Sequence, residues 1–410
     1  MTQIIFYTIL AIIIFDFALE RFLDYLNSTH WSSKIPKELI GIYDEEKYSK
    51  SQLYEKTNSR FSQLTSSFSF VIILIMLFFN GFAFVDSIAR TFSTNETLIS
   101  ILFFGIIMLA SDILNIPFSI YDTFVIEQKF GFNKTTVKTF VFDKIKSWLL
   151  MIILGGGILW LIIWFYNISP QNFWLYAWIL VASFSIFMVM FYSSLIVPMF
   201  NKQTPLEDGE LKDAISNFSQ KVGFKLDNIF VINGSKRSTK ANAYFSGLGA
   251  KKRIVLYDTL INDLSTNEIV AVLAHEIGHY KKKHTLYSIA ISIIQTGITL
   301  YILSLFINNL SLSQALGVEK VSFHIGIIAF GLLYSPISTV IGLLMNIFSR
   351  KNEFEADNYA SEHFEGKYLI NGLKKLSVKN LSNLNPHPLY VFFNYSHPTL
   401  LKRIENIKLK

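Results

Sequence analysis

Cysteine is absent from this sequence of 410 residues, and charged residues are scarce. Without cysteine the chain can form no disulfide framework and no Cys-ligated zinc site, so His, Asp and Glu must supply any zinc ligands. Only 16% of the residues are charged, whereas 51% are hydrophobic and the mean hydropathy is +0.39. This balance is too apolar for an ordinary soluble domain and predicts a membrane protein.

The net charge of +7 does not indicate a nucleic-acid-binding protein. The basic residues are spread over the segments between apolar runs, and no nucleic-acid-binding signature accompanies them. The N-terminal apolar run lacks a basic n-region, and Asp16 and Glu20 interrupt or follow it where a signal peptide needs small residues. We therefore expect a retained first helix and no nucleic acid among the partners.

Seven segments are long enough to cross a bilayer, which takes about 20 apolar residues. The last two of them have buried helices of a soluble domain as an alternative, but their length favours the membrane. Lys and Arg are concentrated in the connections after the first, third and fifth segments, so the positive-inside rule predicts an external N-terminus and cytoplasmic odd-numbered connections and C-terminal tail. The segments lie near residues 3–20, 66–87, 97–119, 147–167, 173–198, 285–308 and 322–348.

The apolar segments divide the chain into four parts. Residues 1–198 carry the first five spans, and residues 285–348 carry the sixth and seventh. Residues 199–284 and 349–410 have the composition of one mixed domain that these two spans interrupt. Three short strands are predicted in its first part, at 228–232, 241–247 and 253–257. The predicted fold class is a mainly α-helical multi-pass membrane protein with a second domain of helices and a small β-sheet.

Residues His275-Glu276-Ile277-Gly278-His279 form an H-E-x-x-H motif in a chain with only eight histidines. Side chains four apart share one face of an α-helix, so both imidazoles can reach one metal ion while Glu276 stands beside its open coordination position. Ser265 and Glu268 form the pattern of a capping box, which predicts that this segment is helical. A chance match on an amphipathic helix is the alternative; the motif favours a zinc peptidase with Glu276 as its catalytic base.

A catalytic zinc ion needs a third protein ligand, and residues 350–357 offer three acids. Glu353 and Asp357 share a helical face, whereas Glu355 points about 200° away from Glu353 at about 100° per residue. We assign His275, His279 and Glu353 as ligands of one Zn²⁺ per chain. Asp357 is expected to accept a hydrogen bond from the free ring nitrogen of a ligating histidine. The alternative is a solvated acidic helix start.

Further motifs follow one another along the chain. They include Ser51-Gln52, residues 127–134 (EQKFGFNK), Pro205-Leu206-Glu207, residues 235–238 (SKRS), residues 242–245 (NAYF), residues 253–260 (RIVLYDTL) and residues 395–398 (YSHP). With these motifs nearly the whole chain resembles the type I CAAX prenyl protease family, the integral-membrane zinc endopeptidases that remove the C-terminal tripeptide of prenylated proteins. The resemblance implies seven spans around a chamber, with a gluzincin-like zinc protease domain whose site lies at the cytoplasmic end.

The resemblance also implies roles for residues outside the metal site. His397 would steady the substrate carbonyl as it becomes an oxyanion, whereas a His-Pro pair alone would more often be a turn. His284 lacks the spacing of a third histidine ligand, so we expect it to help structure the membrane boundary. An edge strand would pair with the extended substrate, with an ordinary structural strand as the alternative; its residues would be Asn242, Ala243, Tyr244 and Phe245.

The Ile-, Asn- and Lys-rich composition and short connections favour a bacterial member of the family. We therefore expect the bacterial inner membrane, or the endoplasmic reticulum membrane in a eukaryote. Most bacteria lack prenylated proteins, which favours membrane protein quality control or peptide processing as the role. The expected partners are peptide or protein substrates, lipidated or not, and membrane lipids, with the protein itself a monomer.

Two other functions remain open at this point. A zinc-bound membrane chaperone or scaffold with little proteolysis would share the metal site. A transporter would explain the intramembrane acids Asp16 and Asp112, because ionisable groups at depth are usually functional. It would leave the H-E-x-x-H motif unexplained.

Overall fold

The computed structural model describes residues 1–32, 34–35, 37, 40–224, 229–247 and 253–409. Within these residues, seven helical segments are long and apolar enough to cross a membrane. Four of them are single helices: α1 (Thr2–Ser28), α2 (Glu45–Phe78), α13 (His284–Phe306) and α15 (Phe323–His363). The third span, Glu96–Phe130, begins with α4 (Glu96–Tyr121) and ends with α5 (Gln128–Phe130), and the fourth, Val137–Ile168, joins α6 (Val137–Leu150) to α7 (Gly156–Ile168). The fifth, Phe173–Phe200, begins with α8 (Phe173–Leu195) and ends with α9 (Val197–Phe200). The seven predicted spans are confirmed.

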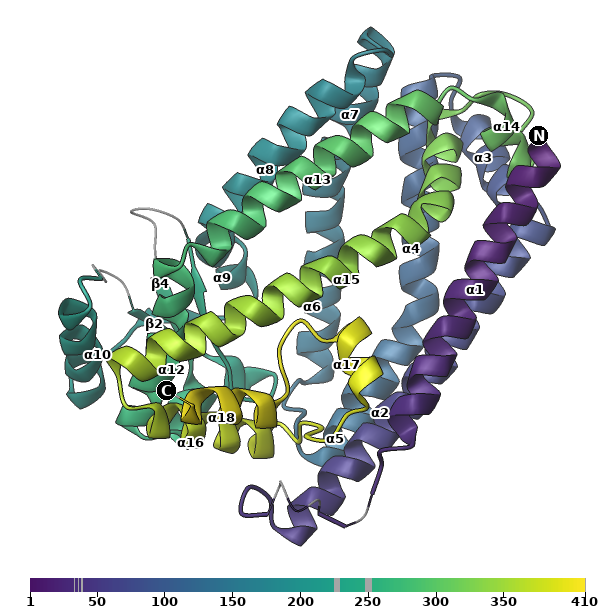
Figure 1. Ribbon diagram of the computed structural model, residues 1–410. Coiled ribbons are helices and arrows are strands. Elements are labelled where there is room, and N and C mark those ends of the chain that lie inside the picture. The colour runs from purple at the N-terminus through teal and green to yellow at the C-terminus, as the bar shows by residue number, and fades with distance from the viewer. Residues whose placement is uncertain (33, 36, 38–39, 225–228, 248–252, 410) are drawn as a thin grey trace.

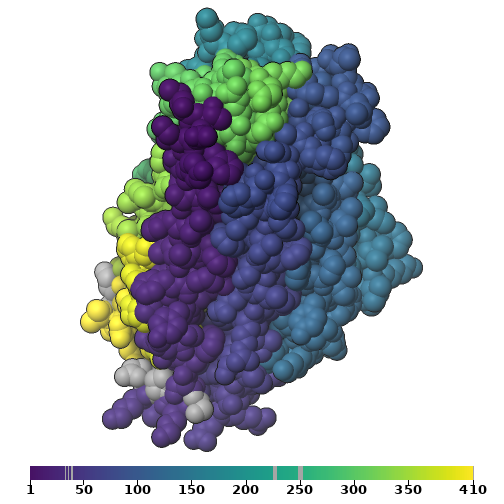
Figure 2. Space-filling view, turned by 90° about the vertical axis from the view of Figure 1, so that its right-hand side faces the viewer, coloured from purple at the N-terminus to yellow at the C-terminus, as the bar shows by residue number. Residues whose placement is uncertain are grey.

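The spans form two groups, and α15 contacts both of them. In Figure 1, α7, α8 and α13 lie on one side, α1 and α2 on the other, and α15 crosses between them. Figure 2 shows α1 running along one face beside α2, with the C-terminal segment next to its lower half. In five of the seven spans, only 6% of the residues in an apolar stretch of 18 residues are buried inside the protein. Such low burial is expected of helices that face lipid.

Span boundaries differ from the prediction in the second segment. The apolar run predicted one helix over 66–87, but α2 ends at Phe78 and a separate helix, α3 (Gly81–Phe92), follows. Asn80 between them has a φ of 52°, a left-handed conformation that asparagine tolerates better than most residues and that ends a helix. Hydropathy alone continues through this turn, so the pattern could not locate it.

A small sheet and a cluster of helices form the second domain. Its strands are β1 (Gln203–Pro205), β2 (Ile229–Ile232), β3 (Ala243–Ser246) and β4 (Arg253–Tyr257), in the order β1-β2-β4-β3. The three predicted strands are present, although Asn228 lies outside the described residues, and β1 was missed because it has three residues. The domain's helices are α10 (Glu210–Lys221), α11 (Asp258–Asp263), α12 (Thr266–Lys281), α16 (Gly366–Lys379), α17 (Pro388–Asn394) and α18 (Leu400–Lys408).

The odd-numbered connections and the C-terminal tail meet at one end of the spans. Lys240 Nζ lies 2.8 Å from Glu127 Oε2, and Arg237 Nη2 lies 2.7 Å from Asp143 Oδ2. The Tyr43 hydroxyl donates to the carbonyl oxygen of Ser377 at 2.9 Å. The predicted grouping of these segments on one side is therefore correct, and the sheet and its helices lie on that side.

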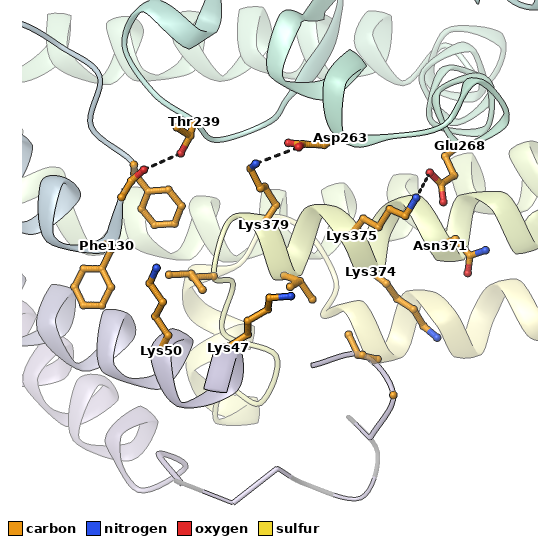
Figure 3. Close-up of a pocket in the computed structure, with 16 residues that line it drawn as sticks. Lys47, Lys50, Phe130, Thr239, Asp263, Glu268, Asn371, Lys374, Lys375 and Lys379 are labelled. Carbon is orange, nitrogen blue, oxygen red and sulfur yellow. Dashed lines mark hydrogen bonds and ion pairs between the residues drawn. The ribbon is translucent and has the colours of Figure 1, made fainter. Parts of the chain in front are cut away.

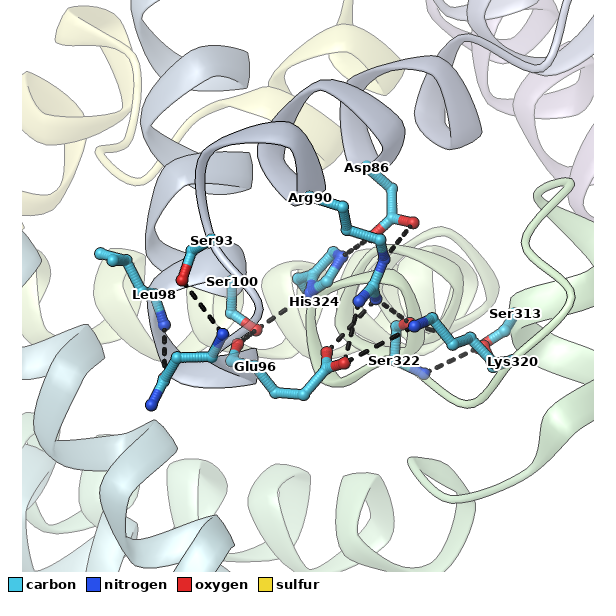
Figure 4. Close-up of polar contacts among 11 residues, drawn as sticks. Asp86, Arg90, Ser93, Glu96, Leu98, Ser100, Ser313, Lys320, Ser322 and His324 are labelled. Atoms are coloured by element: carbon cyan, nitrogen blue, oxygen red, sulfur yellow. Dashed lines mark hydrogen bonds and ion pairs between the residues drawn. The ribbon is translucent and has the colours of Figure 1, made fainter.

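The even-numbered connections meet at the opposite end, where a polar network joins α3, α4 and α15 (Figure 4). The buried His324 places its two ring nitrogens 2.7 Å from Asp86 Oδ1 and 2.9 Å from Ser100 Oγ. Arg90 donates to Asp86, to Glu96 and to Ser322. We call these residues the His324 cluster. Because its buried polar groups satisfy one another, the cluster fixes the three helix ends relative to each other.

Candidate metal centre and substrate strand

The H-E-x-x-H motif lies on α12, which begins as the sequence predicts. Ser265 is the N-cap, its side chain accepts from the Glu268 backbone, and Glu268 Oε2 accepts from the Ser265 backbone N–H at 2.8 Å. Apolar side chains behind the motif, such as Ile269, Leu273 and Ile277, are buried in the domain core. The opposite face of α12 is therefore free to direct His275 and His279 towards α15.

Gly278 allows α12 and α15 to approach closely. A Cβ at this position would lie 3.1 Å from both Cα and the carbonyl oxygen of Ala356, which is tighter than ordinary packing. The close approach brings Glu353 and Asp357 on α15 against the histidines of α12. Both carboxylates are buried, at 4% and 0% exposure.

The three assigned ligands converge on one point. His275 Nε2 and His279 Nε2 are 3.1 Å apart, and His279 Nε2 lies 3.2 Å from Glu353 Oε1. One ligand atom from each residue lies within 4.8 Å of the others. Ligands about 2.0–2.1 Å from a tetrahedral zinc ion are about 3.3 Å apart, so these spacings fit zinc.

Two further observations support a cation at this point. The Nδ1 atom of His275 lies 2.8 Å from Asp357 Oδ1, so this nitrogen carries the proton and Nε2 presents a lone pair towards the other ligands. Glu353 Oε2 is buried and has no hydrogen bond among the described residues. Arg403 Nη1 is the nearest cationic group to this oxygen, at 3.4 Å. Converging lone pairs are costly unless a cation lies between them.

Asp357 has a second partner that the sequence analysis missed. Arg403 on α18 donates to Asp357 from Nε at 2.9 Å and from Nη2 at 2.6 Å, a bidentate pair. Burial alone would lower the pKa of Arg403, but the hydrogen bonds to Asp357 and the charge of Glu353 raise it. A signal was present in the sequence: Arg403 interrupts the apolar face that Leu400, Ile404 and Ile407 form.

His284 also lies nearer to the metal centre than predicted. Its Nδ1 is 3.0 Å from His279 Nδ1, and its Nε2 is 3.2 Å from Glu355 Oε2. His284 is the first residue of the sixth span, as expected of a boundary residue, but it also contacts a predicted ligand. Glu355 points away from Glu353, as the helical spacing predicts, and reaches the site only through His284.

Glu276 and His397 flank the ligands. Glu276 is half-buried and has no hydrogen bond or ion pair within the described part of the chain. His397, in the turn between α17 and α18, places Nδ1 3.0 Å from Glu353 Oε1, with 65% of its side chain exposed. This hydrogen bond raises the pKa of the His397 imidazole. A free carboxylate and an N–H donor thus stand beside the metal centre, which suits hydrolysis.

The strand predicted to bind substrate is at the edge of the sheet. β3 pairs antiparallel with β4 on one side, and no described strand covers its other side. A cavity of about 730 Å³ lies between β3 and α8, with Tyr192, Asn242, Tyr244 and Phe245 in its wall. An edge strand that faces a cavity is suited to pairing with an extended peptide, although the Ala243 N–H donates to Asn242 Oδ1 at 2.8 Å.

Seven spans and an H-E-x-x-H helix facing a glutamate define an integral-membrane metallopeptidase. The profile described as "CAAX prenyl protease N-terminal, five membrane helices" matches residues 25–202, and that of "Peptidase family M48" matches residues 205–409. The chain belongs to peptidase family M48 and is a zinc metallopeptidase of the CAAX prenyl protease 1 group, as the sequence resemblance implied.

Similar proteins match along almost their whole length. The chain is 40% identical to CAAX prenyl protease 1 homolog of Dictyostelium discoideum, over 92% of this chain and 90% of the relative. It is 35% identical to CAAX prenyl protease 1 of Saccharomyces cerevisiae, over 95% and 92%. The crystal structure of S. mikatae Ste24p superimposes with a TM-score of 0.94 at 35% identity, covering 98% of this chain and 99% of that one.

Proposed function

We propose that this protein binds one Zn²⁺ per chain through His275, His279 and Glu353 and hydrolyses peptide bonds near the C-terminus of prenylated proteins. The observation that carries the proposal is the convergence of these three ligand atoms beside the unpaired carboxylate of Glu276. The substrate class comes from the relatives, whose names state that they are CAAX prenyl proteases. A scaffold without proteolysis has no use for a free carboxylate there.

Each residue of the proposed metal centre has its own role in the reaction. Zinc, when bound, polarises the scissile carbonyl and makes water more acidic. Glu276 removes a proton from the attacking water and delivers it to the leaving amide nitrogen. His397 donates a hydrogen bond to the carbonyl oxygen as negative charge develops there. Asp357 and Arg403 hold the His275 ring in the orientation that presents Nε2.

Residues Asn242 to Phe245 would hold the substrate as an added strand on β3. Main-chain hydrogen bonds align the peptide without requiring a particular sequence. A prenyl group on the substrate would enter the apolar interior of the spans. A farnesylated CAAX peptide should therefore be cleaved faster than the same peptide without its lipid. Equal rates for both peptides would argue for a general endopeptidase and against this substrate class.

The test of the catalytic assignment is Glu276→Gln in the purified, zinc-loaded protein. We expect zinc content and thermal stability to remain, while peptide turnover falls by about 10²–10⁴-fold because proton transfer is lost. Glu405→Gln, on an exposed site of α18, is the matched control and should cleave normally. Full turnover in Glu276→Gln would refute its role as the base.

We further propose that the protein acts as a monomer with its N-terminus outside and its metal centre on the cytoplasmic side. The basic connections gathered at that end support this orientation. The compartment proposed from composition is a bacterial inner membrane, or the endoplasmic reticulum membrane if the source is eukaryotic. Membrane fractionation with a tagged chain tests it.

A further inference from the structure

A second cavity lies away from the metal centre and is rich in lysine. It is an open cleft with a volume of about 950 Å³, bordered by the start of α2, the Phe130–Phe132 turn, Thr239 and α16. Figure 3 shows Lys47 and Lys50 extending from α2 towards α16. The lysines in its wall are Lys47, Lys50, Lys374, Lys375 and Lys379. We call it the lysine cavity.

The charges of this cavity do not cancel. Among the described residues of its wall, only two carboxylates, Asp263 and Glu268, accompany the five lysines, which leaves an excess of three positive charges in this part of the wall. Lys375 pairs with Glu268 at 2.7 Å and Lys379 with Asp263 at 3.1 Å. A cleft lined by an excess of one sign of charge attracts ions of the opposite sign, here anions.

Two of the lysines have no carboxylate partner in the described residues. Lys50 is exposed and Lys374 is half-buried, and neither lies within 4.0 Å of an acidic oxygen. Lys47 has only Asp44, at 3.2 Å, and both side chains are more than half exposed, so that pair is weak. The cavity therefore offers three ammonium groups to a ligand.

The remaining wall of the cavity gives the ligand a second kind of contact. Ile42, Val378 and Leu381 line it beside the rings of Phe130 and Phe132, and Asn371 adds a side-chain amide. Phe130, Phe132 and Leu381 are themselves almost fully buried, which makes this wall rigid. Volume and lining match those of cavities that hold small molecules with a few polar anchors.

We propose that the lysine cavity binds a soluble, multiply charged phosphate compound of the class of nucleoside triphosphates or inositol polyphosphates. Lysines bind phosphate as compact point charges, and about three negative charges would neutralise the excess. Lys50 precedes the apolar half of α2, which begins near residue 66, by about 16 residues, or about 24 Å of helix. That separation favours a soluble ligand over a lipid headgroup.

The cavity connects the membrane part of the chain to the metal-binding helix. Lys50 belongs to α2, whereas Lys374 belongs to α16, whose neighbour Lys375 holds Glu268 in the capping box of α12. A ligand that bridges Lys50 and Lys374 therefore joins the two parts. Because it binds the folded protein, it should also raise the thermal midpoint.

The experiment measures binding of inorganic triphosphate to the full-length protein in phosphatidylcholine nanodiscs by calorimetry and thermal shift. We expect saturable binding and a raised midpoint. The double variant Lys50→Gln, Lys374→Gln should weaken binding by about tenfold or more, because it removes both unpaired charges and leaves the ion pairs intact. The control is the double variant Lys402→Gln, Lys408→Gln, which removes the same number of charges from exposed sites of α18. It should bind triphosphate as the parent protein does.

Three results would overturn the proposal. Unchanged binding by the Lys50, Lys374 variant would place the anion elsewhere. Equal affinity for a triglutamate peptide would mean that the cavity recognises charge and not phosphate. Stabilisation by nanodiscs that contain a phosphoinositide, without any by free triphosphate, would assign the cavity to a lipid headgroup.

Discussion

His397 is mostly exposed and touches the metal centre only through Glu353. If it donates to the developing oxyanion, His397→Ala should lower kcat by about 10²–10³-fold with little change in KM, because the bond strengthens only in the transition state. Steady-state kinetics on a fluorogenic peptide measures both constants. Ser396→Ala, at the preceding exposed residue, is the control. Loss of zinc from His397→Ala would instead make it a ligand.

Arg403 shows why some site residues escaped the sequence analysis. His275, His279, Glu353 and Asp357 were predicted because a spacing of four within one helix fixes which side chains share a face. Arg403 lies 46 positions after Asp357 on a different helix, and only tertiary packing brings them together. Residue spacing thus predicts contacts within an element and fails between elements.

At the scale of elements, Gly278 sets the distance between α12 and α15. Gly278→Ala should push the helices apart, lower the stability by about 1–3 kcal/mol through overpacking and reduce zinc occupancy. Gly342→Ala on α15 is the control, since a Cβ there meets nothing within 4 Å. Metal analysis and thermal unfolding measure the two effects. Full zinc occupancy in Gly278→Ala would show that the backbone contact does not position the ligands.

The cap of α12 should make stability depend on pH. Burial alone would raise the pKa of Glu268, but hydrogen bonds from Lys375 and Ser265 outweigh it and hold the pKa below the usual glutamate range. A carboxylate with a lowered pKa stabilises the fold above its unfolded pKa of about 4.3, and this contribution is lost as pH falls below that value and through the lower folded pKa.

Glu268→Gln tests this dependence, because glutamine keeps the size of the side chain and cannot ionise. Thermal midpoints measured from pH 7 to pH 3.5 should fall more steeply in the parent than in the variant. The two proteins should converge in acid, where the parent's Glu268 is protonated. Parallel curves would mean that groups other than Glu268 determine the pH dependence of the thermal midpoint.

The sequence predicted most elements of the fold, for reasons that differ between them. Long apolar runs located all seven spans, and the capping box located the start of α12. The turn at Asn80 and the three-residue β1 were missed, because hydropathy does not register a single backbone angle and a strand this short forms only by pairing with β2. The predicted domain limit at 348/349 falls inside α15 and remains a proposal.

At the scale of the whole molecule, the proposed orientation can be tested by labelling. The chain has no cysteine, so each introduced cysteine is the sole thiol. A membrane-impermeant reagent added from outside should label Glu319→Cys, next to the His324 cluster, and not Lys134→Cys until the membrane is opened. Both positions are exposed in the structure. The reverse pattern would place the metal centre outside.

The long helix α15 has one more consequence. It carries His324 near its first residue and Glu353 near its last turns, and its 41 residues extend over about 60 Å. Such a helix resists compression along its axis, although Pro336 removes one hydrogen bond from its interior. The anchoring of His324 on one side of the bilayer therefore braces Glu353, the proposed zinc ligand, on the other side. A soluble fragment cut from the membrane helices would retain the ligands and lose that brace.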